Sequence, residues 1–352
     1  MKHLESYCIT QYGQPLMLSQ MKTPQPKGNE VLLEILGCGV CHSDLHILDG
    51  HFSLGMGKKI DLSKSHKLPL TLGHEIVGKI VECGEKETEI SIGDIVVVYP
   101  WIGCGKCDLC SSGNEHLCDT PQNLGVNVNG GFSTHIIVPH TKYLFPITNV
   151  DLNLAATYAC SGLTAFSAMK KIKAKANGKH LLIIGAGGVG LAAVKIAKVI
   201  METKIIVADI EPSKRDAALQ AGADFVIDPS EANSRQQITN LSSGGAIAAA
   251  DFVGSDITVK FGTQCLRKLG CLVVVGLFGG SVGLSVPMFP LKSISVVGSF
   301  VGSLSEMGEL MNIVNSGAIG AIPVSTRPLA EVNECLEDLA KGNVIGRTVL
   351  NP

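Results

Sequence analysis

The chain has 352 residues, of which 45% are hydrophobic, and its formal net charge is −2 at pH 7. This length provides enough apolar material for two domains. The interspersed charges form no basic face for nucleic acid and no polybasic patch for a membrane surface. Residues 1–15 lack the basic start and apolar run of a signal peptide, and no run reaches the roughly 18 apolar residues of a spanning helix.

The first part of the chain predicts short strands at 7–10 and 30–36, separated by proline and glycine breaks. The stretch GVCHSDLH at 39–46 follows and is predicted to enter a short helix. Its Cys41 would suit a borderline-soft ion such as Zn²⁺. The hydroxyl and carboxylate of Ser43 and Asp44, like the imidazole of His46, are groups that can move a proton or orient a ligand beside a metal.

Residues 50–68 are polar and glycine-rich, which favours a solvated loop; next to a site, such a loop can also act as a lid. His74 and Glu75 then precede an apolar strand at 76–81. A single histidine before a strand is usually structural, but the adjacent carboxylate makes His74 a second candidate metal ligand.

A β-forming run at 94–99 leads to the only tryptophan, Trp101, which is expected either to pack or to wall an apolar substrate pocket. Four cysteines follow on one short segment: Cys104, Cys107, Cys110 and Cys118. Their close spacing disfavours disulfides and differs from that of ferredoxin clusters and of zinc ribbons. We predict a closed Cys₄ zinc site, which is structural because no coordination position is open. Clustered thiols also indicate a reducing compartment, here the cytoplasm.

Cys160 lies in an apolar segment, 151–161, where a cysteine is typically a small buried hydrophobe. The chain then changes character over 180–209, which reads as a buried strand, a GxGxxG turn, an apolar helix, a second strand and an acid. This order is typical of a dinucleotide-binding unit, with the phosphates received at the helix N-terminus. The turn residues expected to contact the cofactor are Gly185, Gly187, Gly188, Val189 and Gly190.

A carboxylate at Asp209 would accept hydrogen bonds from the adenosine ribose and repel a 2′-phosphate, which predicts NAD in preference to NADP. Lys214 and Arg215 can soften that preference. Alternating strands and helices are expected to continue to the C-terminal region, with strands at 224–227, 248–253, 272–276 and 293–301, and helices at 213–221, 257–268, 304–316 and 329–341. A final strand at 346–350 is predicted to rejoin the first domain.

Together these features resemble the zinc-containing alcohol dehydrogenases of the medium-chain dehydrogenase/reductase family, and look nearest to the bacterial and archaeal tetrameric branch. The likeness runs from about residue 5 to the C-terminus. Five motifs carry it: GVCHSD at 39–44, GHE at 73–75, the four cysteines of 104–118, CSGLT at 160–164 and GAGGVG at 185–190.

The resemblance implies that Cys41, His74 and Cys160 bind a catalytic zinc, which overrides the interpretation of Cys160 as a plain core residue. Glu75 would approach the metal when the site is empty, and Asp44 would hold the other nitrogen of His74. Zinc would lower the pKa of a bound alcohol. Its proton would leave through Ser43, the nicotinamide ribose and His46 while NAD⁺ takes the hydride.

Further cofactor contacts are implied for His42 and Arg347 with the phosphates, and for Thr164 and the run Gly276, Leu277 and Phe278 with the nicotinamide. Trp101, Leu124 and Phe300 would line an apolar, roomy substrate pocket. We therefore expect medium-sized apolar or aromatic primary and secondary alcohols. A polyol or a specialised metabolite is the alternative substrate within the same fold, and a non-catalytic NAD-binding protein is the alternative outside it.

The implied fold is α/β, with a GroES-like, mostly β catalytic domain at 1–156 and 298–352 and a doubly wound Rossmann domain at 157–297. The structural zinc lobe would occupy about 100–120. Two zinc ions per subunit and NAD are the expected cofactors. The expected partners are a small alcohol or aldehyde and further copies of the chain, as a homotetramer or a dimer.

Overall fold

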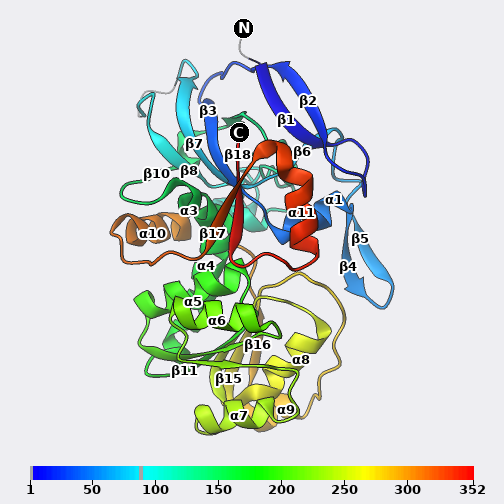
Figure 1. Ribbon diagram of the computed structural model, residues 1–352, viewed down its shortest axis with the longest axis vertical. Coiled ribbons are helices and arrows are strands. Elements are labelled where there is room, and N and C mark those ends of the chain that lie inside the picture. Colours follow the sequence, from blue (N-terminus) through cyan, green and yellow to red (C-terminus); the bar gives the residue numbers. More distant parts are fainter. Residues whose placement is uncertain (1–2, 87–89) are drawn as a thin grey trace.

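The computed structural model describes residues 3–86 and 90–352. Its elements form two bodies stacked along the long axis, one built on a mixed sheet and one on a parallel sheet (Figure 1). We call them the mixed-sheet domain and the parallel-sheet domain. Both described ends of the chain lie in the mixed-sheet domain, so the other domain is inserted between two parts of it.

The mixed-sheet domain contains a seven-stranded sheet, in which β10-β8-β7-β3-β18-β17 run side by side and β9 also pairs with β3. A three-stranded sheet, β2-β1-β6, and a hairpin, β4-β5, stand beside it. The strands are β1 (His3–Ile9), β2 (Met17–Lys22), β3 (Val31–Gly39), β4 (His51–Gly55), β5 (Lys58–Asp61), β6 (Leu70–Thr71), β7 (Glu75–Cys83), β8 (Ile95–Val98), β9 (His135–Val138), β10 (Leu144–Pro146), β17 (Val324–Pro328) and β18 (Arg347–Asn351). Its helices are α1 (His42–Leu48), α2 (Asp108–Ser111), α3 (Leu152–Thr157), α10 (Leu304–Asn315) and α11 (Val332–Ala340), with short 3₁₀ turns at 115–117, 141–143 and 329–331.

The parallel-sheet domain has six strands in the order β13-β12-β11-β14-β15-β16, all paired in parallel. The strands are β11 (Lys179–Ile184), β12 (Thr203–Ala208), β13 (Phe225–Ile227), β14 (Ala246–Asp251), β15 (Leu266–Val274) and β16 (Ser295–Gly298). The helices are α4 (Leu163–Ala176), α5 (Gly188–Ile200), α6 (Pro212–Ala221), α7 (Ser234–Leu241), α8 (Asp256–Cys265) and α9 (Met288–Lys292).

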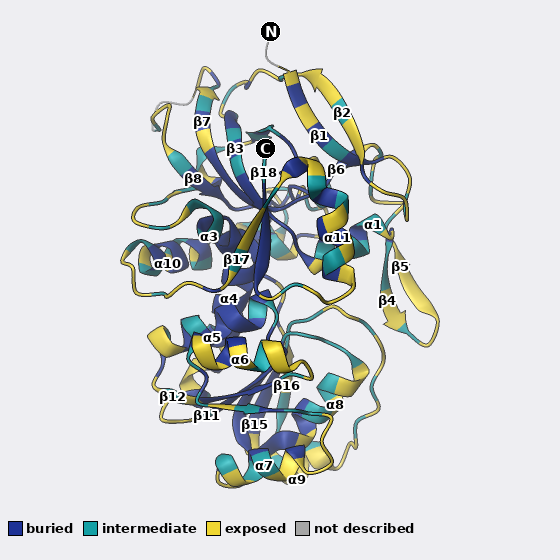
Figure 2. Cartoon of the chain, in the orientation of Figure 1, coloured by how far each residue is buried: buried dark blue, intermediate teal, exposed yellow. Residues whose placement is uncertain are grey.

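Alternation along the parallel strands divides the core into two layers. In β11, Leu181 and Ile183 face the layer that holds α4 and α5, whereas Leu182 and Ile184 face the layer that holds α7 and α8. Successive strand residues point to opposite faces, so a strand covered on both sides is apolar throughout. The central strands are accordingly buried along their length (Figure 2). The predicted doubly wound fold is confirmed.

The last strand places the end of the sequence inside the first domain. β18 pairs with β3 through Val349 opposite Gly39 and Leu350 opposite Cys38, and it is parallel to β17 on its other side. The predicted return of 346–350 to the first domain is therefore confirmed. β16, the last strand of the parallel sheet, ends at Gly298, and we propose the same division into 1–156 plus 298–352 and 157–297.

Two predictions about local structure were wrong. The segment 50–68 is not a plain loop, because its first part forms the β4-β5 hairpin. The helix expected over 257–268 ends at Cys265, and β15 begins at Leu266 and continues to Val274. Within the described residues, no helix has both the length and the apolar character that crossing a bilayer requires.

Candidate active site

Three buried side chains from distant parts of the chain converge below the mixed sheet. Cys41 follows β3 and precedes α1, His74 immediately precedes β7, and Cys160 lies in a π-helical turn at Tyr158–Gly162. β3 and β7 pair so that Gly39 lies opposite Glu75, which brings the first two side chains together. One donor atom from each of the three residues lies within 4.8 Å of the others.

The donor set fits zinc. Two thiols and an imidazole are ligands that zinc prefers, and three protein ligands leave a fourth position for water or substrate. His74 Nδ1 is 3.3 Å from Asp44 Oδ1, which leaves Nε2 for a metal. That atom is fully buried and has no hydrogen-bond partner in the described chain. An imidazole nitrogen buried without a partner is costly, and a bound metal ion would satisfy it.

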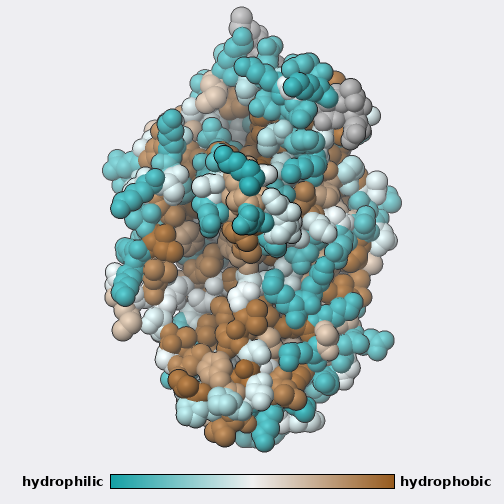
Figure 3. Space-filling view, turned by 180° about the vertical axis from the view of Figure 1, so that it is seen from behind, coloured by the Kyte–Doolittle hydropathy of each residue, from teal (hydrophilic) through white to brown (hydrophobic). Residues whose placement is uncertain are grey.

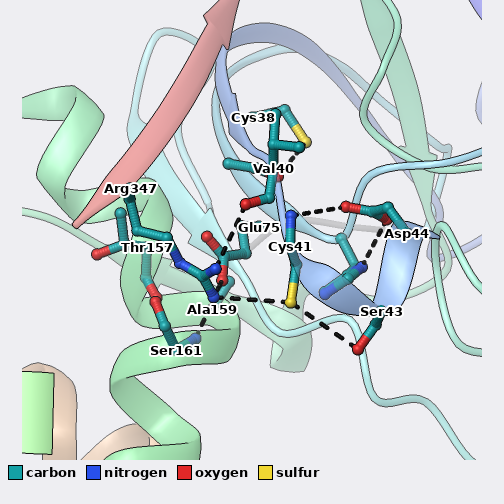
Figure 4. Close-up of polar contacts among 12 residues, drawn as sticks. Cys38, Val40, Cys41, Ser43, Asp44, Glu75, Thr157, Ala159, Ser161 and Arg347 are labelled. Atoms are coloured by element: carbon teal, nitrogen blue, oxygen red, sulfur yellow. Dashed lines mark hydrogen bonds and ion pairs between the residues drawn. The ribbon is translucent and has the colours of Figure 1, made fainter. Parts of the chain in front are cut away.

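Asp44 orients two of the three donors (Figure 4). Its Oδ2 accepts the backbone N–H of Cys41 at 2.9 Å, and its Oδ1 faces His74. A hydrogen bond with Cys160 lowers the pKa of the Cys41 thiol, and the charge of Arg347 lowers it further, against the effect of burial. One thiol of the pair is thus readily ionised, as metal binding requires.

Glu75 and Arg347 form a buried ion pair behind the thiols. Glu75 Oε1 accepts from Arg347 Nη2 at 2.7 Å and from the backbone N–H of Ser161 at 3.1 Å. Arg347 Nη2 also lies 3.6 Å from Cys41 Sγ (Figure 4). Burial raises the pKa of Glu75 to about 7, although the charge of Arg347 opposes this. Glu75 Oε2 remains buried without a hydrogen-bond partner among the described residues and lies beside Gly39.

Arg347 also touches the parallel-sheet domain. A Cβ added at Gly188 would lie 2.8 Å from the Arg347 side chain, so the guanidinium group packs directly against the start of α5. Contact between Arg347 and cofactor phosphates stays a prediction. Its ion pair with Glu75 was not expected from the sequence.

The polar side chains of α1 line the approach to Cys41. Ser43 Oγ lies 3.8 Å from Cys41 Sγ, and the ring of His46 lies 5.1 Å from that of Phe52. His42 begins the helix, and its pKa is lowered mainly by desolvation, with a contribution from the charge of Lys214 in the other domain.

Trp101 connects this site with Phe300. Its ring lies 5.3 Å from that of His74 and meets the ring of Phe300 edge-on at 5.8 Å, while its Nε1 donates to the carbonyl of Ala159 at 3.1 Å. Leu124 is buried, and its backbone N–H donates to Pro100. Val301, which follows Phe300, has φ of +38°, a rare conformation for a β-branched residue.

An open cavity of about 320 Å³ adjoins Phe300. Its walls come from β4, from the segment after β5, from the end of the cysteine lobe, from 121–127 and from Phe300. Of its lining residues, the sequence predicted Phe300 for the substrate pocket and Cys118 as a ligand of the structural zinc. It missed the polar ones, His66, His116, Asn123 and Asn127, because nothing in their local pattern distinguishes them from surface residues.

The four lobe cysteines meet as predicted. Sγ–Sγ separations are 3.5 Å for Cys107–Cys110, 3.8 Å for Cys107–Cys118 and 4.0 Å for Cys104–Cys110. A tetrahedron with Zn–S arms of about 2.3 Å has edges of about 3.8 Å, so the set matches a closed zinc site. The twelve cysteines, all of which lie in the described ranges, form no disulfide.

The glycine turn has the close contacts that a dinucleotide site needs. Gly185 has φ of +89°, and a Cβ at Gly190 would collide with the carbonyl of Gly185, whereas a Cβ at Gly187 would meet nothing within 4 Å. The backbone at Gly187 is therefore open to a phosphate at the N-terminus of α5. Asp209 follows β12 and accepts the Ala186 N–H at 2.7 Å, which places its carboxylate beside the turn.

The residues predicted to contact the nicotinamide come from two segments, the start of α4 and the segment after β15. Thr164 is buried near the start of α4, and Gly276 follows β15, where its N–H donates to Asp251. Leu277 and Phe278 are 44% and 68% exposed, so their side chains are free to meet a cofactor.

Family models match both domains: an alcohol dehydrogenase GroES-like domain over residues 27–149 and a zinc-binding dehydrogenase domain over 188–316. The chain is 38% identical over 346 residues to an NAD-dependent alcohol dehydrogenase of Sulfurisphaera tokodaii, covering 98% of this chain and 99% of the relative. The chain therefore belongs to the zinc-containing alcohol dehydrogenases of the medium-chain dehydrogenase/reductase family.

Solved structures of other dehydrogenases have the same fold as this chain. An alcohol dehydrogenase from Aeropyrum pernix has a TM-score of 0.89 at 32% identity, covering 99% of this chain and 100% of that one. A D-arabinose dehydrogenase from Sulfolobus solfataricus has a TM-score of 0.85 at 27% identity, covering 100% of both chains. The same architecture therefore occurs in one protein named for an alcohol and in one named for a sugar.

Proposed function

We propose that the protein is a zinc-dependent, NAD-dependent alcohol dehydrogenase that interconverts primary or secondary alcohols with aldehydes or ketones. The observation that carries this proposal is the Cys41–His74–Cys160 cluster, with a buried Nε2 that has no partner within the described chain, next to a glycine turn. When bound, zinc supplies a Lewis acid that activates the alcohol or carbonyl, and NAD accepts or returns the hydride.

The chain's own residues position the reactants and move the proton. Asp44 fixes the orientation of His74 and of the Cys41 backbone. We infer that Ser43, whose Oγ lies 3.8 Å from Cys41 Sγ, relays the hydroxyl proton of the substrate and that His46 passes it to solvent. Trp101 walls the site against water, and Arg347 compensates the negative charge of Glu75 and the thiolates.

Asp209 supports NAD as the preferred cofactor, because its carboxylate lies beside the turn that would hold the pyrophosphate. Arg215, which could have attracted a 2′-phosphate, donates to the backbone carbonyl of Asp209 and pairs with Asp228 at 3.1 Å. Lys214 remains the residue that could soften the preference.

We further propose that the chain assembles with itself, as a tetramer or a dimer, and that it works in the cytoplasm. β16 is an edge strand with Val296 and Val297 exposed, and Val286, Met288 and Leu291 are exposed nearby. Seen from behind the view of Figure 1, apolar residues gather on the surface of the parallel-sheet domain (Figure 3). Val297→Lys should shift the mass measured by light scattering towards the monomer, since an exposed edge pairs readily with a second copy.

The activity is tested by following NADH formation across aliphatic, benzylic and polyol alcohols, with NADP⁺ in parallel. The enzyme must first contain two zinc ions per chain. We expect turnover of apolar alcohols with NAD⁺. Ser43→Ala should lower kcat/KM by about 10²-fold or more, whereas Ser43→Thr, which keeps the hydroxyl, should retain most of it. Absence of turnover with every alcohol would refute the proposed function.

A further inference from the structure

Two acidic residues leave the parallel sheet side by side. β12 and β13 pair in parallel with Ala208 opposite Ile227, so the residues that follow, Asp209 and Asp228, lie at the same edge of the sheet. The N–H of Asp209 donates to the carbonyl of Ile227 at 3.2 Å. Asp209 has the position of the acid that accepts the adenosine ribose, and Asp228 has the equivalent position one strand further from β11 and its glycine turn. The cofactor contacts expected from the sequence leave Asp228 without a role.

Arg215 joins these two acids. It lies on α6, and its Nη1 donates to the carbonyl oxygens of Asp209 at 2.8 Å and Ile210 at 2.9 Å, and to Oδ2 of Asp228 at 3.1 Å. The side chains of Arg215 and Asp228 are 19% and 21% exposed, so salt screens this ion pair less than one on the open surface. The guanidinium group is therefore held on the backbone of the residue that would bind the ribose.

Asp228 is itself fixed in place. Its Oδ1 accepts the backbone N–H of Ser230 at 2.9 Å and the hydroxyl of Ser230 at 2.6 Å, while Oδ2 faces Arg215. The hydrogen bonds from Ser230, followed by the charge of Arg215, lower the pKa of Asp228, so its carboxyl group is ionised at neutral pH. The arginine thus faces a negative charge whose position is set by the chain and does not depend on a ligand.

The charge of Arg215 is important because of where it lies. An arginine near the ribose-binding acid can accommodate the 2′-phosphate of NADP, since its planar fork matches the phosphate oxygens. Here the charge of that arginine is already compensated by Asp228, and its Nη1 already has three acceptors. Discrimination between two ligands depends on what the protein denies to one of them as well as on its contacts to the other.

We propose that Asp228 is a positioning residue for cofactor selection, which holds Arg215 against the backbone of Asp209 and Ile210 and withholds its charge from a 2′-phosphate. NADP is thus rejected twice, by the carboxylate of Asp209 directly and by Asp228 through Arg215. The inference rests on the proposed NAD-dependent function and adds a second determinant to the preference for NAD. It also explains why Arg215, despite its charge, does not soften that preference in the unchanged protein.

The test measures dissociation constants of NADH and NADPH from the fluorescence of the reduced nicotinamide bound to the zinc-loaded protein, which requires no alcohol. Asp228→Asn keeps the size of the side chain but removes its charge, so it should release Arg215. We expect NADPH to bind about tenfold more tightly to this variant, because its phosphate gains a charge-assisted partner. NADH, which has no such phosphate, should bind nearly as before.

Further variants assign the effect to the ion pair. Arg215→Gln added to Asp228→Asn should cancel the gain in NADPH affinity. Asp228→Glu, which keeps the charge, should retain the original ratio of the two dissociation constants. Asp224→Asn is the matched control, because it removes a carboxylate just before β13 begins, where Asp224 pairs with Lys198 and Lys204 at 2.8 and 2.9 Å. This control should leave the ratio unchanged.

Equal changes in both affinities in Asp228→Asn, or a gain for NADPH that persists after Arg215→Gln, would overturn the proposal. If Asp228→Asn fails to fold, Ser230→Ala removes one of the hydrogen bonds that fix Asp228, at an exposed position, and should shift the ratio towards NADPH by a smaller factor. An unchanged ratio in Ser230→Ala would then overturn the proposal as well. These outcomes leave the proposed dehydrogenase standing, whereas binding of neither NADH nor NADPH to the unchanged protein refutes the proposed function.

Discussion

His74 has two ring nitrogens with different surroundings. Nδ1 lies 3.3 Å from Asp44 Oδ1, and Nε2 is buried with no hydrogen-bond partner in the described ranges. Such an arrangement fixes which nitrogen can bind a metal. The functional unit at the residue scale is therefore a ligand together with the carboxylate that orients it.

His74→Ala should remove one zinc ion and leave the other. The variant keeps both thiols but loses the only imidazole donor, and two ligands do not make a stable zinc site. Metal analysis should show about one zinc per chain in place of about two, with loss of alcohol turnover. His3→Ala, at an exposed histidine on β1, serves as the control and should keep both ions. Retention of two zinc ions in His74→Ala would contradict the ligand assignment.

Asp44→Asn should weaken zinc binding without removing a ligand. The amide oxygen can replace one carboxylate contact, to Cys41 N–H or to His74, but it has no charge to hold the imidazole. Competition with a chelator should give an affinity about 10- to 100-fold lower. Asp49→Asn, at the exposed end of the same helix, is the matched control. Equal affinities in the two variants would show that Asp44 does not act on the metal site.

Residue-scale prediction succeeded where the ligand type and spacing were distinctive. The lobe cysteines could be assigned from their own spacing, but Cys160 could not, because its neighbours are those of an ordinary core segment. Its role came from the family resemblance. The ion pair of Arg347 with Glu75 was missed because it depends on β18 pairing with β3, more than 300 residues away in sequence. No local pattern contains such a pairing.

At the scale of elements, the cysteine lobe is a segment whose packing depends on its metal. It has one short helix, α2, and a 3₁₀ turn, with few buried side chains. Cys107→Ser should therefore reduce the zinc content to about one per chain and lower Tm, because metal binding contributes directly to folding. Asp108→Asn changes an exposed neighbour in the same helix and should do neither. An unchanged Tm in Cys107→Ser would show that the lobe packs without its metal.

The β4-β5 hairpin shows why one element was missed. Its turn contains Met56 and Gly57, both with positive φ, where asparagine–glycine is the usual signal. Its strands are mostly exposed, so burial imposes no alternation of apolar and polar residues. The parallel strands were found more reliably, because burial on both faces makes them continuously apolar.

At the scale of the whole molecule, this hairpin spans the gap between the domains. A Cβ at Gly55 would lie 2.5 Å from the backbone carbon of Gly280, and a Cβ at Gly279 would lie 2.7 Å from the carbonyl oxygen of Ser53. The two backbones can touch because Gly55 and Gly279 have no Cβ. The hairpin thus closes one side of the space in which the cofactor and substrate would meet.

Gly55→Ala should separate the hairpin from the parallel-sheet domain. Gly57→Ala is a well-matched control, because it has nearly the same φ, +75° against +76°, but nothing within 4 Å of its added methyl group. Both variants carry the same backbone strain, so the difference between them isolates the contact. We expect faster proteolysis within 51–61 and weaker NADH binding for Gly55→Ala alone. Identical behaviour of the two would show that the contact does not hold the domains together.

The position of β18 has a consequence for the order in which the protein is made. It is made after every other described element, yet it lies between β3 and β17 in the interior of the sheet. The inserted parallel-sheet domain is synthesised whole before this strand exists and can fold first, as domains do during translation. Until β18 is made, the sheet of the mixed-sheet domain lacks the strand that lies between β3 and β17. Because Arg347 arrives with that strand, Glu75 lacks this countercharge until β18 has been made, so the ion pair behind the metal ligands forms only after those ligands have been synthesised.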